Sequence, residues 1–248
     1  MSRYTGYDSF AEIYNRHWGG FAKRVVPALD SLGLSDLSPG DHIVDVCCGT
    51  GQLAAVLTER GLRVTGVDGS DDMLSVARRN APQASFLAAD VRAFAVATPA
   101  RMAVSTFDSL NHILDLAGLE QALRCVAGAL ERGARFVFDL NMDETFRANW
   151  HGTFVIDEDP DLVIARSEYD PEDRLGSVYL TMMTRDQDLW HRSDLELTQR
   201  AYTKEEVQLA LHRAGFGSVE DHDAADIMEN GLRVKQFPER VSPSIIRY

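Results

Sequence analysis

The feature that most constrains the fold is a regular alternation of short β-branched runs with helical segments between residues 42 and 141. The segments between the runs carry apolar residues three or four positions apart, as amphipathic helices do. This alternation indicates parallel strands joined by helical crossovers, which form a doubly wound sheet with its ligand site at the carboxyl ends of the strands. We predict strands over 42–46, 63–68, 84–90, 102–107 and 134–140.

Helices are predicted on both sides of this pattern. Residues 116–133 form an amphipathic pattern with Leu119, Leu123, Val126 and Leu130 on one stripe, and Gly133 is expected to end the helix. Ahead of the first strand, residues 7–18 and 20–33 predict two helices, which could cover the sheet edge or close over a site as a lid.

The sequence pattern changes between residues 150 and 201, where alternating apolar and polar residues, typical of strands, are separated by polar turn clusters. We expect an antiparallel meander inserted into, or laid over, the parallel sheet, with strands over 153–156, 162–169, 175–183 and 193–202. A helix should resume after Thr203, because Glu206 stands three residues later and completes a capping box. Two final strands are predicted near 218–227 and 231–237, and the tail 238–248 gives no signal.

Composition narrows the class of protein. The chain has 248 residues with 45% hydrophobic and 25% charged, which suits one large α/β domain with an elaboration. A net charge of −13, with no basic cluster longer than a dipeptide, argues against binding nucleic acid through its phosphates. No apolar run approaches the roughly 20 residues of a membrane span, and the N-terminus lacks an apolar signal core. We therefore expect a cytoplasmic protein that does not bind membranes.

Cysteines and histidines give no metal signature. Cys47 and Cys48 are neighbours and Cys125 lies in a helical pattern, so neither a disulfide framework nor a metal-binding spacing is present. The histidines at positions 151, 191, 212 and 222 share no ligand spacing with carboxylates or cysteines. We predict no metal site.

Three acidic residues fall at successive strand ends around a glycine turn. Gly49, Gly51 and Ala54 give a G-x-G-x-x-A spacing that suits a dinucleotide turn, but Asp45 just ahead of it would repel a pyrophosphate. The same charge favours a cofactor that carries an ammonium and a sulfonium. Asp68 suits ribose hydroxyls, and Asp90 can accept a hydrogen bond from an adenine amino group. Each could be only a helix cap or a solvated strand end, but three in register favour a nucleotide site.

Four segments together resemble the successive motifs of class I S-adenosylmethionine-dependent methyltransferases: 44-VDVCCGTG-51, 64-VTGVDGSDDML-74, 89-ADVR-92 and 106-TFDSLNHI-113. The resemblance covers roughly residues 7 to 220 and is greatest to the small-molecule branch, with its amino-sugar N-methyltransferases and glycine N-methyltransferase-like enzymes. Cys47 stands where the family motif usually has its first glycine. The resemblance implies S-adenosylmethionine as cofactor and S-adenosylhomocysteine as product.

The family also implies a fold and a division of the chain. The expected fold is α/β, a doubly wound, mostly parallel seven-stranded Rossmann-like sheet with a small antiparallel β-meander insertion. Residues 1–36 would form a helical cover or lid, and residues 37–149 with 202–248 would form the cofactor-binding domain. Residues 150–201 would form the antiparallel insertion and part of the acceptor site.

The resemblance assigns cofactor roles residue by residue. Asp45 and the Gly49–Gly51 backbone would approach the methionine part, Asp68 the ribose and Asp90 the adenine amino group, whereas Ser70 is expected to cap a helix. The expected cofactor-binding residues are Tyr14, Asp45, Cys47, Gly49, Thr50, Gly51, Asp68, Gly69, Met73, Asp90, Val91, Thr106 and Phe107.

Methyl transfer is an in-line displacement, so positioning and electrostatics should carry most of the catalysis. An amine acceptor needs no general base, whereas a hydroxyl would usually need one. Related enzymes place a histidine facing the acceptor and a tyrosine over the methyl group, which makes His112 and Tyr14 the catalytic candidates; both could instead pack structurally. The candidate substrate residues are Asp108, Asn111, Tyr169 and Tyr179.

The leading hypothesis is therefore methyl transfer to an amine or hydroxyl of a small molecule. A protein or tRNA substrate and a non-catalytic S-adenosylmethionine-binding module are the alternatives, while a nicotinamide oxidoreductase has only the glycine spacing in its favour. The sequence leaves open the acceptor, the atom methylated, the number of methyl groups and the oligomeric state, with a homodimer among the outcomes.

Overall fold

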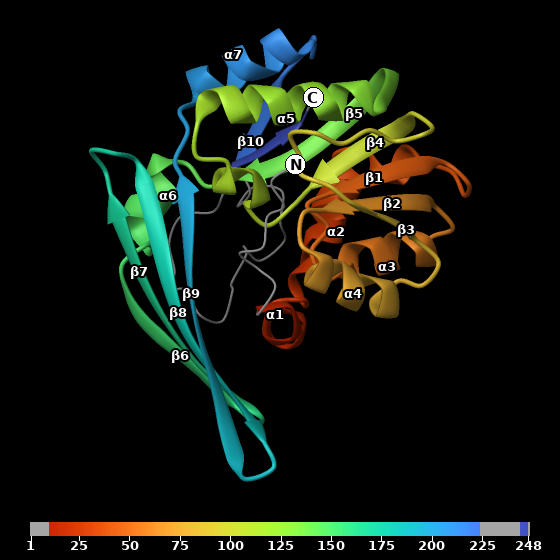
Figure 1. Cartoon of the computed structure of the whole chain (residues 1–248). Coiled ribbons are helices and arrows are strands. Elements are labelled where there is room, and N and C mark those ends of the chain that lie inside the picture. The colour runs from red at the N-terminus through yellow and green to blue at the C-terminus, as the bar shows by residue number, and fades with distance from the viewer. Residues whose placement is uncertain (1–9, 224–243, 248) are drawn as a thin grey trace.

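The computed structural model describes residues 10–223 and 244–247, and it forms two sheets (Figure 1). In the larger sheet, five parallel strands run in the order β5–β4–β1–β2–β3. Beyond β5, β11 pairs antiparallel with β5 and β10 pairs antiparallel with β11. The expected α/β doubly wound arrangement with a separate antiparallel sheet is confirmed. The strands are β1 (His42–Val46), β2 (Arg63–Asp68), β3 (Ser85–Ala88), β4 (Ala100–Ser105), β5 (Leu130–Leu140), β10 (Glu220–Asp223) and β11 (Ser244–Arg247).

Helices cover both faces of the parallel sheet, which explains why its strands read as continuous apolar runs. On β1, Ile43 packs with the core under α2 (Phe21–Ser31) and α3 (Gln52–Glu59). Its neighbours Val44 and Val46 pack with the opposite core under α5 (Leu116–Gly128) and α7 (Lys204–Ala214). Helix α4 (Asp71–Asn80) follows β2 on the side of α3.

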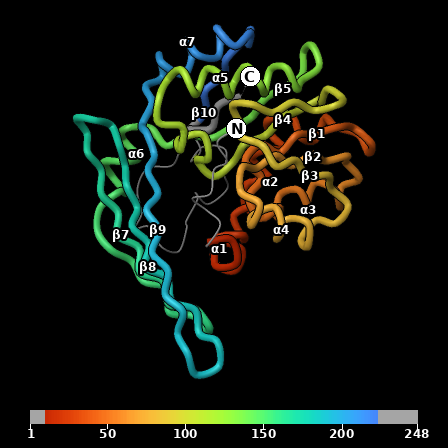
Figure 2. Tube along the Cα trace, viewed as in Figure 1, coloured from red at the N-terminus to blue at the C-terminus, as the bar shows by residue number. Residues whose placement is uncertain are grey.

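The antiparallel strands form their own four-stranded sheet in the order β6–β7–β8–β9. They comprise β6 (Gly152–Glu158), β7 (Asp161–Asp170), β8 (Leu175–Asp186) and β9 (Leu189–Arg200). Figures 1 and 2, which share one viewpoint, show this sheet beside the parallel sheet, with the β8–β9 hairpin projecting from the body. Helix α1 (Ala11–His17) lies between the two bodies and shares a buried core with α4 and the inner face of the antiparallel sheet.

Element boundaries agree with the sequence where local signals are strong. The bounds of β1 and β2 coincide with the predicted ones, and Thr203 forms the predicted capping box with Glu206 at the start of α7. The helix expected to reach Gly133 is a correction: α5 ends at Gly128, because Leu130 pairs with Ala100 and begins β5.

Other elements escaped prediction. The short helix α6 (Asp143–Asn149) and the 3₁₀ turns Leu34–Asp36 and Ser109–His112 had no assigned signal, and β11 lies in the tail that gave none. The strand predicted near 231–237 and the start of the first predicted helix lie outside the described residues.

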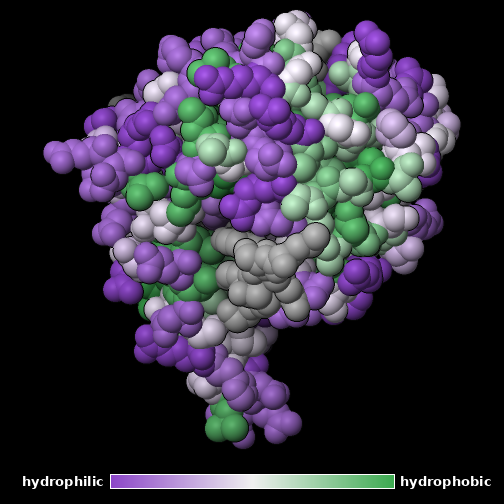
Figure 3. Space-filling view, turned by 45° about the horizontal axis from the view of Figure 1, so that its top comes forward, coloured by the Kyte–Doolittle hydropathy of each residue, from purple (hydrophilic) through white to green (hydrophobic). Residues whose placement is uncertain are grey.

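The surface carries few exposed large apolar side chains: among the described residues they are Leu114, Val155, Leu189, Trp190 and Leu209. The projecting end of the antiparallel sheet is mostly hydrophilic in the face that Figure 3 shows. Over the part of the chain that the structure describes, no helix is both long and apolar enough to cross a membrane.

Candidate functional site

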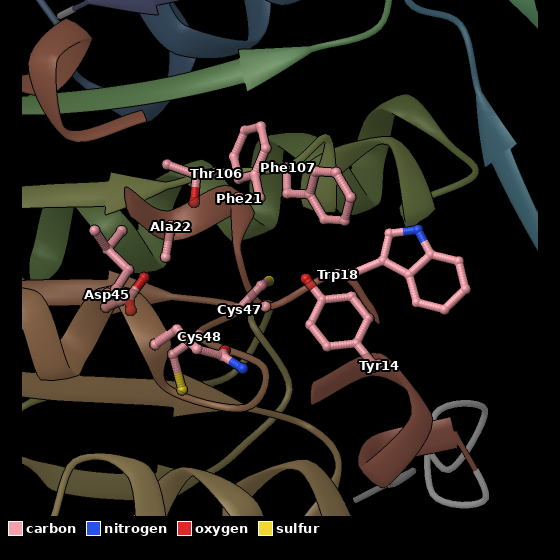
Figure 4. A pocket seen from close by; sticks show the side chains of 12 residues that line it. Tyr14, Trp18, Phe21, Ala22, Asp45, Cys47, Cys48, Thr106 and Phe107 are labelled. Atoms are coloured by element: carbon pink, nitrogen blue, oxygen red, sulfur yellow. The ribbon is translucent and has the colours of Figure 1, made fainter. Parts of the chain in front are cut away.

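A cavity lies at the carboxyl ends of β1 and β4, beneath α1 and the start of α2 (Figure 4). Its empty space, with the open mouth included, is about 350 Å³. Figure 4 shows the Tyr14 hydroxyl directed into it toward Cys47. The lining residues are Tyr14, Trp18, Gly19, Phe21, Ala22, Asp45, Cys47, Cys48, Gln52, Leu53, Thr106 and Phe107.

The glycine turn that follows β1 has a backbone that few residues tolerate. Cys47, Gly49 and Gly51 all adopt positive φ, at 59°, 52° and 76°. A Cβ at Gly51 would lie 2.8 Å from the Cβ of Ala77 on α4, so only glycine fits there. Cys47 adopts the left-handed conformation without being glycine, which places local strain at the wall of the cavity.

Asp68 tethers this turn to the end of β2. Its Oδ2 accepts a hydrogen bond from the Gly49 N–H at 2.8 Å, and its Oδ1 accepts one from the Ser70 N–H at 2.9 Å. Gly69 lies between Asp68 and Ser70, directly after β2. Ser70 caps α4 by accepting a hydrogen bond from the Met73 N–H at 3.1 Å, as predicted. The carboxylate thus fixes the glycine turn to the start of α4.

The other predicted cofactor residues lie around this loop. Thr50 is fully buried and its Oγ1 donates to Gln52 Oε1 at 2.6 Å, and Met73 is buried in the core beneath α1. Val91 packs at the edge of the α5-side core. Asp90 accepts hydrogen bonds from Arg92 Nε and Nη2 at 2.9 and 2.6 Å, and this pairing lowers the pKa of the carboxyl.

Buried carboxylates give the site its electrostatic character. Burial, and then the charge of Asp68, raises the pKa of Asp45 to about 8. Burial, and then the charge of Asp139, raises that of Asp108 to about 8, and burial raises that of Asp139 to about 7. Among the described residues that line the cavity, none is Lys, Arg or His. Such a site stabilises positive charge in a ligand.

These carboxylates also act on neighbouring groups. Burial, and then the charges of Asp108, Asp68, Asp45 and Asp139, raises the pKa of the Tyr14 hydroxyl well above its ordinary value. Tyr14 is therefore a hydrogen-bond donor and not a base at neutral pH. Burial and the same negative surroundings raise the pKa values of the Cys47 and Cys48 thiols, which keeps both thiols protonated.

The turn after β4 is strained and held by a carboxylate. Phe107 and Asp108 adopt positive φ of 67° and 49°, one after the other. The Asp108 N–H donates to Asp139 Oδ2 at 2.9 Å, and the Phe107 ring packs on Phe21 of α2 with centroids 4.6 Å apart. Backbone strain of this kind persists only where surrounding contacts fix it, and it concentrates at functional sites.

His112 belongs to a buried network that crosses from this turn to the antiparallel sheet. Its Nδ1 lies 3.1 Å from the Thr198 carbonyl oxygen, and its Nε2 lies 3.1 Å from Gln199 Nε2. Gln199 Nε2 also donates to Asp108 Oδ2 at 2.6 Å, and Asn141 Nδ2 donates to the same oxygen at 2.9 Å. Burial lowers the pKa of His112 to about 4, so the imidazole is neutral near pH 7.

Gln199, like Asn141, is a residue of this network that the sequence analysis did not predict. It lies on β9, far along the chain from Asp108 and His112, and only the pairing of the antiparallel sheet brings it beside them. The alternation of apolar and polar residues along β9 is a weak signal that Gln199 faces inward, but nothing in the sequence indicates that it contacts Asp108 and His112.

Two predicted substrate residues are corrected by their placement. Asn111 is fully buried and uses its amide on backbone groups: Nδ2 donates to the carbonyls of Asn141 and Arg200, and Oδ1 accepts from the Asn141 N–H. Tyr179 faces away from the site, because it alternates with the buried Leu180 and Met182, and its hydroxyl donates to Glu168 at 2.8 Å. Neither is kept in the proposed acceptor site.

Tyr169 shares the inner face of β7 with the buried residues Val163 and Ala165. Its hydroxyl donates to Asp143 Oδ1 at 2.5 Å, and its ring stacks on Phe146 of α6 with centroids 5.1 Å apart. Tyr169 therefore packs in a small core beside α6, and its role in the acceptor site stays a prediction.

Helix α1 bridges the two bodies over the cavity. On the parallel side, Asn15 Oδ1 accepts hydrogen bonds from Gln52 Nε2 at 2.5 Å and from Asn80 Nδ2 at 2.7 Å. On the antiparallel side, Arg16 and His17 both contact the buried Asp161 of β7. Within the described ranges no group of three or more His, Cys, Asp or Glu could hold a metal ion.

Comparison with known proteins places this geometry in context. Residues 43–133 match the methyltransferase domain family. The chain is 24% identical over 220 residues to methyltransferase YqeM of Bacillus subtilis (strain 168), covering 85% of this chain and 86% of that protein. It is 26% identical over 214 residues to dTDP-3-amino-3,4,6-trideoxy-alpha-D-glucopyranose N,N-dimethyltransferase of Streptomyces venezuelae, covering 83% and 89%.

A solved structure shows the same fold. An S-adenosylmethionine-dependent methyltransferase from Clostridium acetobutylicum ATCC 824 superposes with a TM-score of 0.76 at 22% identity, covering 97% of each chain. The superposition therefore extends beyond the parallel sheet to nearly the whole length of both chains.

Proposed function

We propose that this chain, a class I S-adenosylmethionine-dependent methyltransferase, moves a methyl group to an amine or hydroxyl of a small molecule by in-line displacement. The observation that carries the proposal is the cavity at the glycine turn, which contains the buried carboxyl of Asp45 and no Lys, Arg or His among its described lining residues, and which Tyr14 and Trp18 also line.

The residues present fit S-adenosylmethionine. The Oδ2 of Asp45 and the Oγ of Ser105 are buried and have no hydrogen-bond partner among the described residues. An ammonium group would satisfy such a carboxylate, and a sulfonium would reduce the repulsion among the acids. The diphosphate of a nicotinamide cofactor would instead add charge of the same sign beside Asp45, which argues against an oxidoreductase.

The proposed roles follow from position. Asp45 and the Gly49–Gly51 backbone would hold the methionine part, and Asp68 would accept hydrogen bonds from the ribose hydroxyls. Asp90, Val91 and Met73 would surround the adenine. Tyr14, Cys47, Thr50, Gly69, Thr106 and Phe107 complete the proposed cofactor site.

When bound, S-adenosylmethionine supplies an electrophilic methyl group on its sulfonium. The contribution of the chain is to orient that group and exclude water. Tyr14 remains protonated and can donate a hydrogen bond beside the turn, while the aromatic rings of Trp18 and Phe107 wall the cavity. Most of the rate enhancement is then expected from alignment and from electrostatics that suit a cation.

A small-molecule acceptor is favoured over a macromolecule. The amino-sugar dimethyltransferase relative covers most of this chain, including the antiparallel sheet, and it acts on a sugar nucleotide according to its name. The net charge of −13 disfavours tRNA. We infer that the acceptor enters between the turn after β4 and the inner face of the antiparallel sheet, where Asp108 and His112 meet β9.

The test has two stages. Thermal unfolding is measured with S-adenosylmethionine, S-adenosylhomocysteine, NADH and NADPH, each at about 100 times a typical dissociation constant. Saturation of that order stabilises the fold by about 2.7 kcal/mol, which shifts the midpoint by roughly 5–10 °C for a chain of this size. Only the two sulfur nucleotides should do so; stabilisation by a nicotinamide cofactor alone would overturn the assignment.

The second stage follows S-adenosylhomocysteine release with panels of primary and secondary amines, matched alcohols, a mixed tRNA pool and a mixed protein pool. Transfer to a small amine or alcohol supports the proposal. Transfer only to tRNA or protein would favour the macromolecular alternative. Tight cofactor binding with no transfer to any member of the panels would favour a non-catalytic module.

A further inference from the structure

Gln199 of β9 is a buried polar side chain with half of its amide unused. It is 5% exposed, and its Nε2 directs its two N–H groups at Asp108 Oδ2 and His112 Nε2. Its Oε1 is buried and has no hydrogen-bond partner among the described residues. A buried amide oxygen left without a donor is unfavourable, so it calls for an explanation.

The orientation of this amide is set by His112. The Thr198 carbonyl oxygen can only accept, so the imidazole proton lies on Nδ1 and Nε2 presents a lone pair. An amide oxygen facing that lone pair would be repelled, which fixes Nε2 of Gln199 toward the ring and Oε1 away from it. His112 therefore holds Gln199 in one orientation, with its own lone pair already engaged.

Two buried acceptor atoms of this network have no partner among the described residues. Besides Gln199 Oε1, the buried Asp139 Oδ1 lacks a partner, and both belong to a chain of contacts that runs from Asp139 through Asp108 to Gln199. Both atoms accept hydrogen bonds. A ligand that completes this network must bring donors, and a neutral primary amine carries two N–H groups where a hydroxyl carries one O–H.

We propose that Gln199 positions the methyl acceptor, an amine, by accepting a hydrogen bond from its N–H at Oε1 while Asp108 and His112 hold the amide in place. The inference rests on the proposed function and adds to it a residue from the antiparallel sheet. It gives that sheet a direct part in the reaction, because β9 carries the residue that touches the acceptor.

The chemical step is balanced without a further reactant. The lone pair of the neutral amine forms the new N–C bond as the S–C bond breaks, and the bonding electrons stay on sulfur as a neutral thioether. The nitrogen retains its hydrogens and becomes a methylated ammonium, which then loses one proton to Asp108 or to water. A hydrogen bond from one N–H to Gln199 fixes the direction of the nitrogen lone pair. In-line attack requires that lone pair to point at the methyl carbon, opposite the S–C bond.

The experiment compares Gln199→Ala with Gln121→Ala, a matched removal of an exposed glutamine from α5. The probes are dTDP-3-amino-3,4,6-trideoxy-alpha-D-glucopyranose, its 3-hydroxy counterpart, and the amine and alcohol panels. The expected result is that Gln199→Ala lowers kcat/KM for the amine roughly 10- to 100-fold, while its midpoint shift with S-adenosylmethionine matches that of the wild type. Gln199→Asn, which keeps an amide oxygen and its N–H donors on a shorter side chain, should retain more activity than Gln199→Ala.

Each remaining outcome decides against the inference. Equal turnover by Gln199→Ala and Gln121→Ala removes the role of Gln199. Loss of the cofactor-induced shift in Gln199→Ala alone would mean a structural role. Transfer to alcohols but not amines by the wild type overturns the amine assignment and leaves the proposed function standing. Transfer to neither class, with the cofactor still bound, overturns both the amine assignment and the proposed transfer. Failure of S-adenosylmethionine to stabilise the wild type would defeat both.

Discussion

Arg16 on α1 donates hydrogen bonds from Nε and Nη2 to the two carboxylate oxygens of Asp161 on β7, at 2.6 and 2.8 Å. The Asp161 side chain is fully buried, and it also accepts hydrogen bonds from His17 Nε2 at 2.8 Å and Thr184 Oγ1 at 2.7 Å. The helix that carries Tyr14 over the cavity is thus held by the antiparallel sheet. We therefore expect changes at this contact to alter the position of α1 over the cavity.

Asp161→Asn should loosen this attachment. Removing one partner of a buried ion pair leaves the other charge uncompensated, so we expect a loss of about 2 kcal/mol or more in the free energy of unfolding. We also expect weaker S-adenosylmethionine binding, through faster dissociation. Asp194→Asn is the control, because it breaks an exposed pair with Arg192 on the same sheet and should change stability by less than about 1 kcal/mol. Equal effects of the two substitutions would contradict the attachment.

Gly51→Ala should destabilise the chain and abolish cofactor binding. The residue has a φ of 76° and an added Cβ would meet the Cα of Ala77 at 2.9 Å, so either the glycine turn or α4 would have to move. Gly128→Ala at the end of α5 meets nothing within 4 Å and should stabilise by up to about 1 kcal/mol. Urea unfolding of both variants, with and without S-adenosylhomocysteine, measures the contrast; a stable Gly51→Ala that binds normally would refute it.

Cofactor affinity should rise with pH until about pH 8. The pKa of Asp45 is raised from its ordinary value to about 8, so the carboxyl is mostly protonated in the free protein at pH 6. A cationic ligand favours its ionised form, so binding releases protons and strengthens by up to about tenfold per pH unit below pH 8. Calorimetry in two buffers of different ionisation enthalpy measures the release. Asp45→Asn should bind weakly and show a flatter profile, and uptake of protons by the wild type would invalidate the assignment.

Without ligand, the stability of the folded chain should change with pH in the opposite direction to cofactor affinity. Because the folded pKa of Asp45 lies above the unfolded value, the folded state holds more protons, and stability should fall as pH rises from about 4 to about 8. Saturating S-adenosylmethionine should therefore raise the unfolding midpoint more at pH 8 than at pH 6. A larger shift at pH 6 would show that burial of Asp45 is not the dominant cause.

His112 should make the fold sensitive to mild acid. Its pKa is lowered to about 4, so between about pH 6.5 and pH 4 the unfolded chain binds a proton that the folded chain does not. The stability that this neutral histidine contributes is present above pH 6.5 and is lost as pH falls through that window. His112→Gln should reduce the loss in urea titrations at pH 7 and pH 5, whereas His151→Gln, at an exposed position, should leave it unchanged.

Much of the parallel sheet could be predicted because its signals are local. The bounds of β1 and β2 follow from short β-branched runs, and the caps by Ser70 and Thr203 follow from residues three positions apart. The end of α5 was misplaced because the helical periodicity continues through Leu130, and only its pairing with Ala100 ends the helix earlier. A cross-strand partner can outweigh a helical pattern that has no capping residue to stop it.

The candidate site likewise has a part that the sequence predicts and a part that it does not. The sequence by itself determined the glycine turn and the acids Asp45, Asp68 and Asp90 at strand ends, since parallel strands bring their carboxyl ends to one edge whatever the rest of the chain does. Only the tertiary structure decided that Gln199 meets Asp108 and His112, that Tyr179 faces away, and that Asp161 holds Arg16. Those relationships depend on strand register and on how the two sheets pack against α1. A shift of one residue in register would move a side chain from the inner face of a sheet to the outer face.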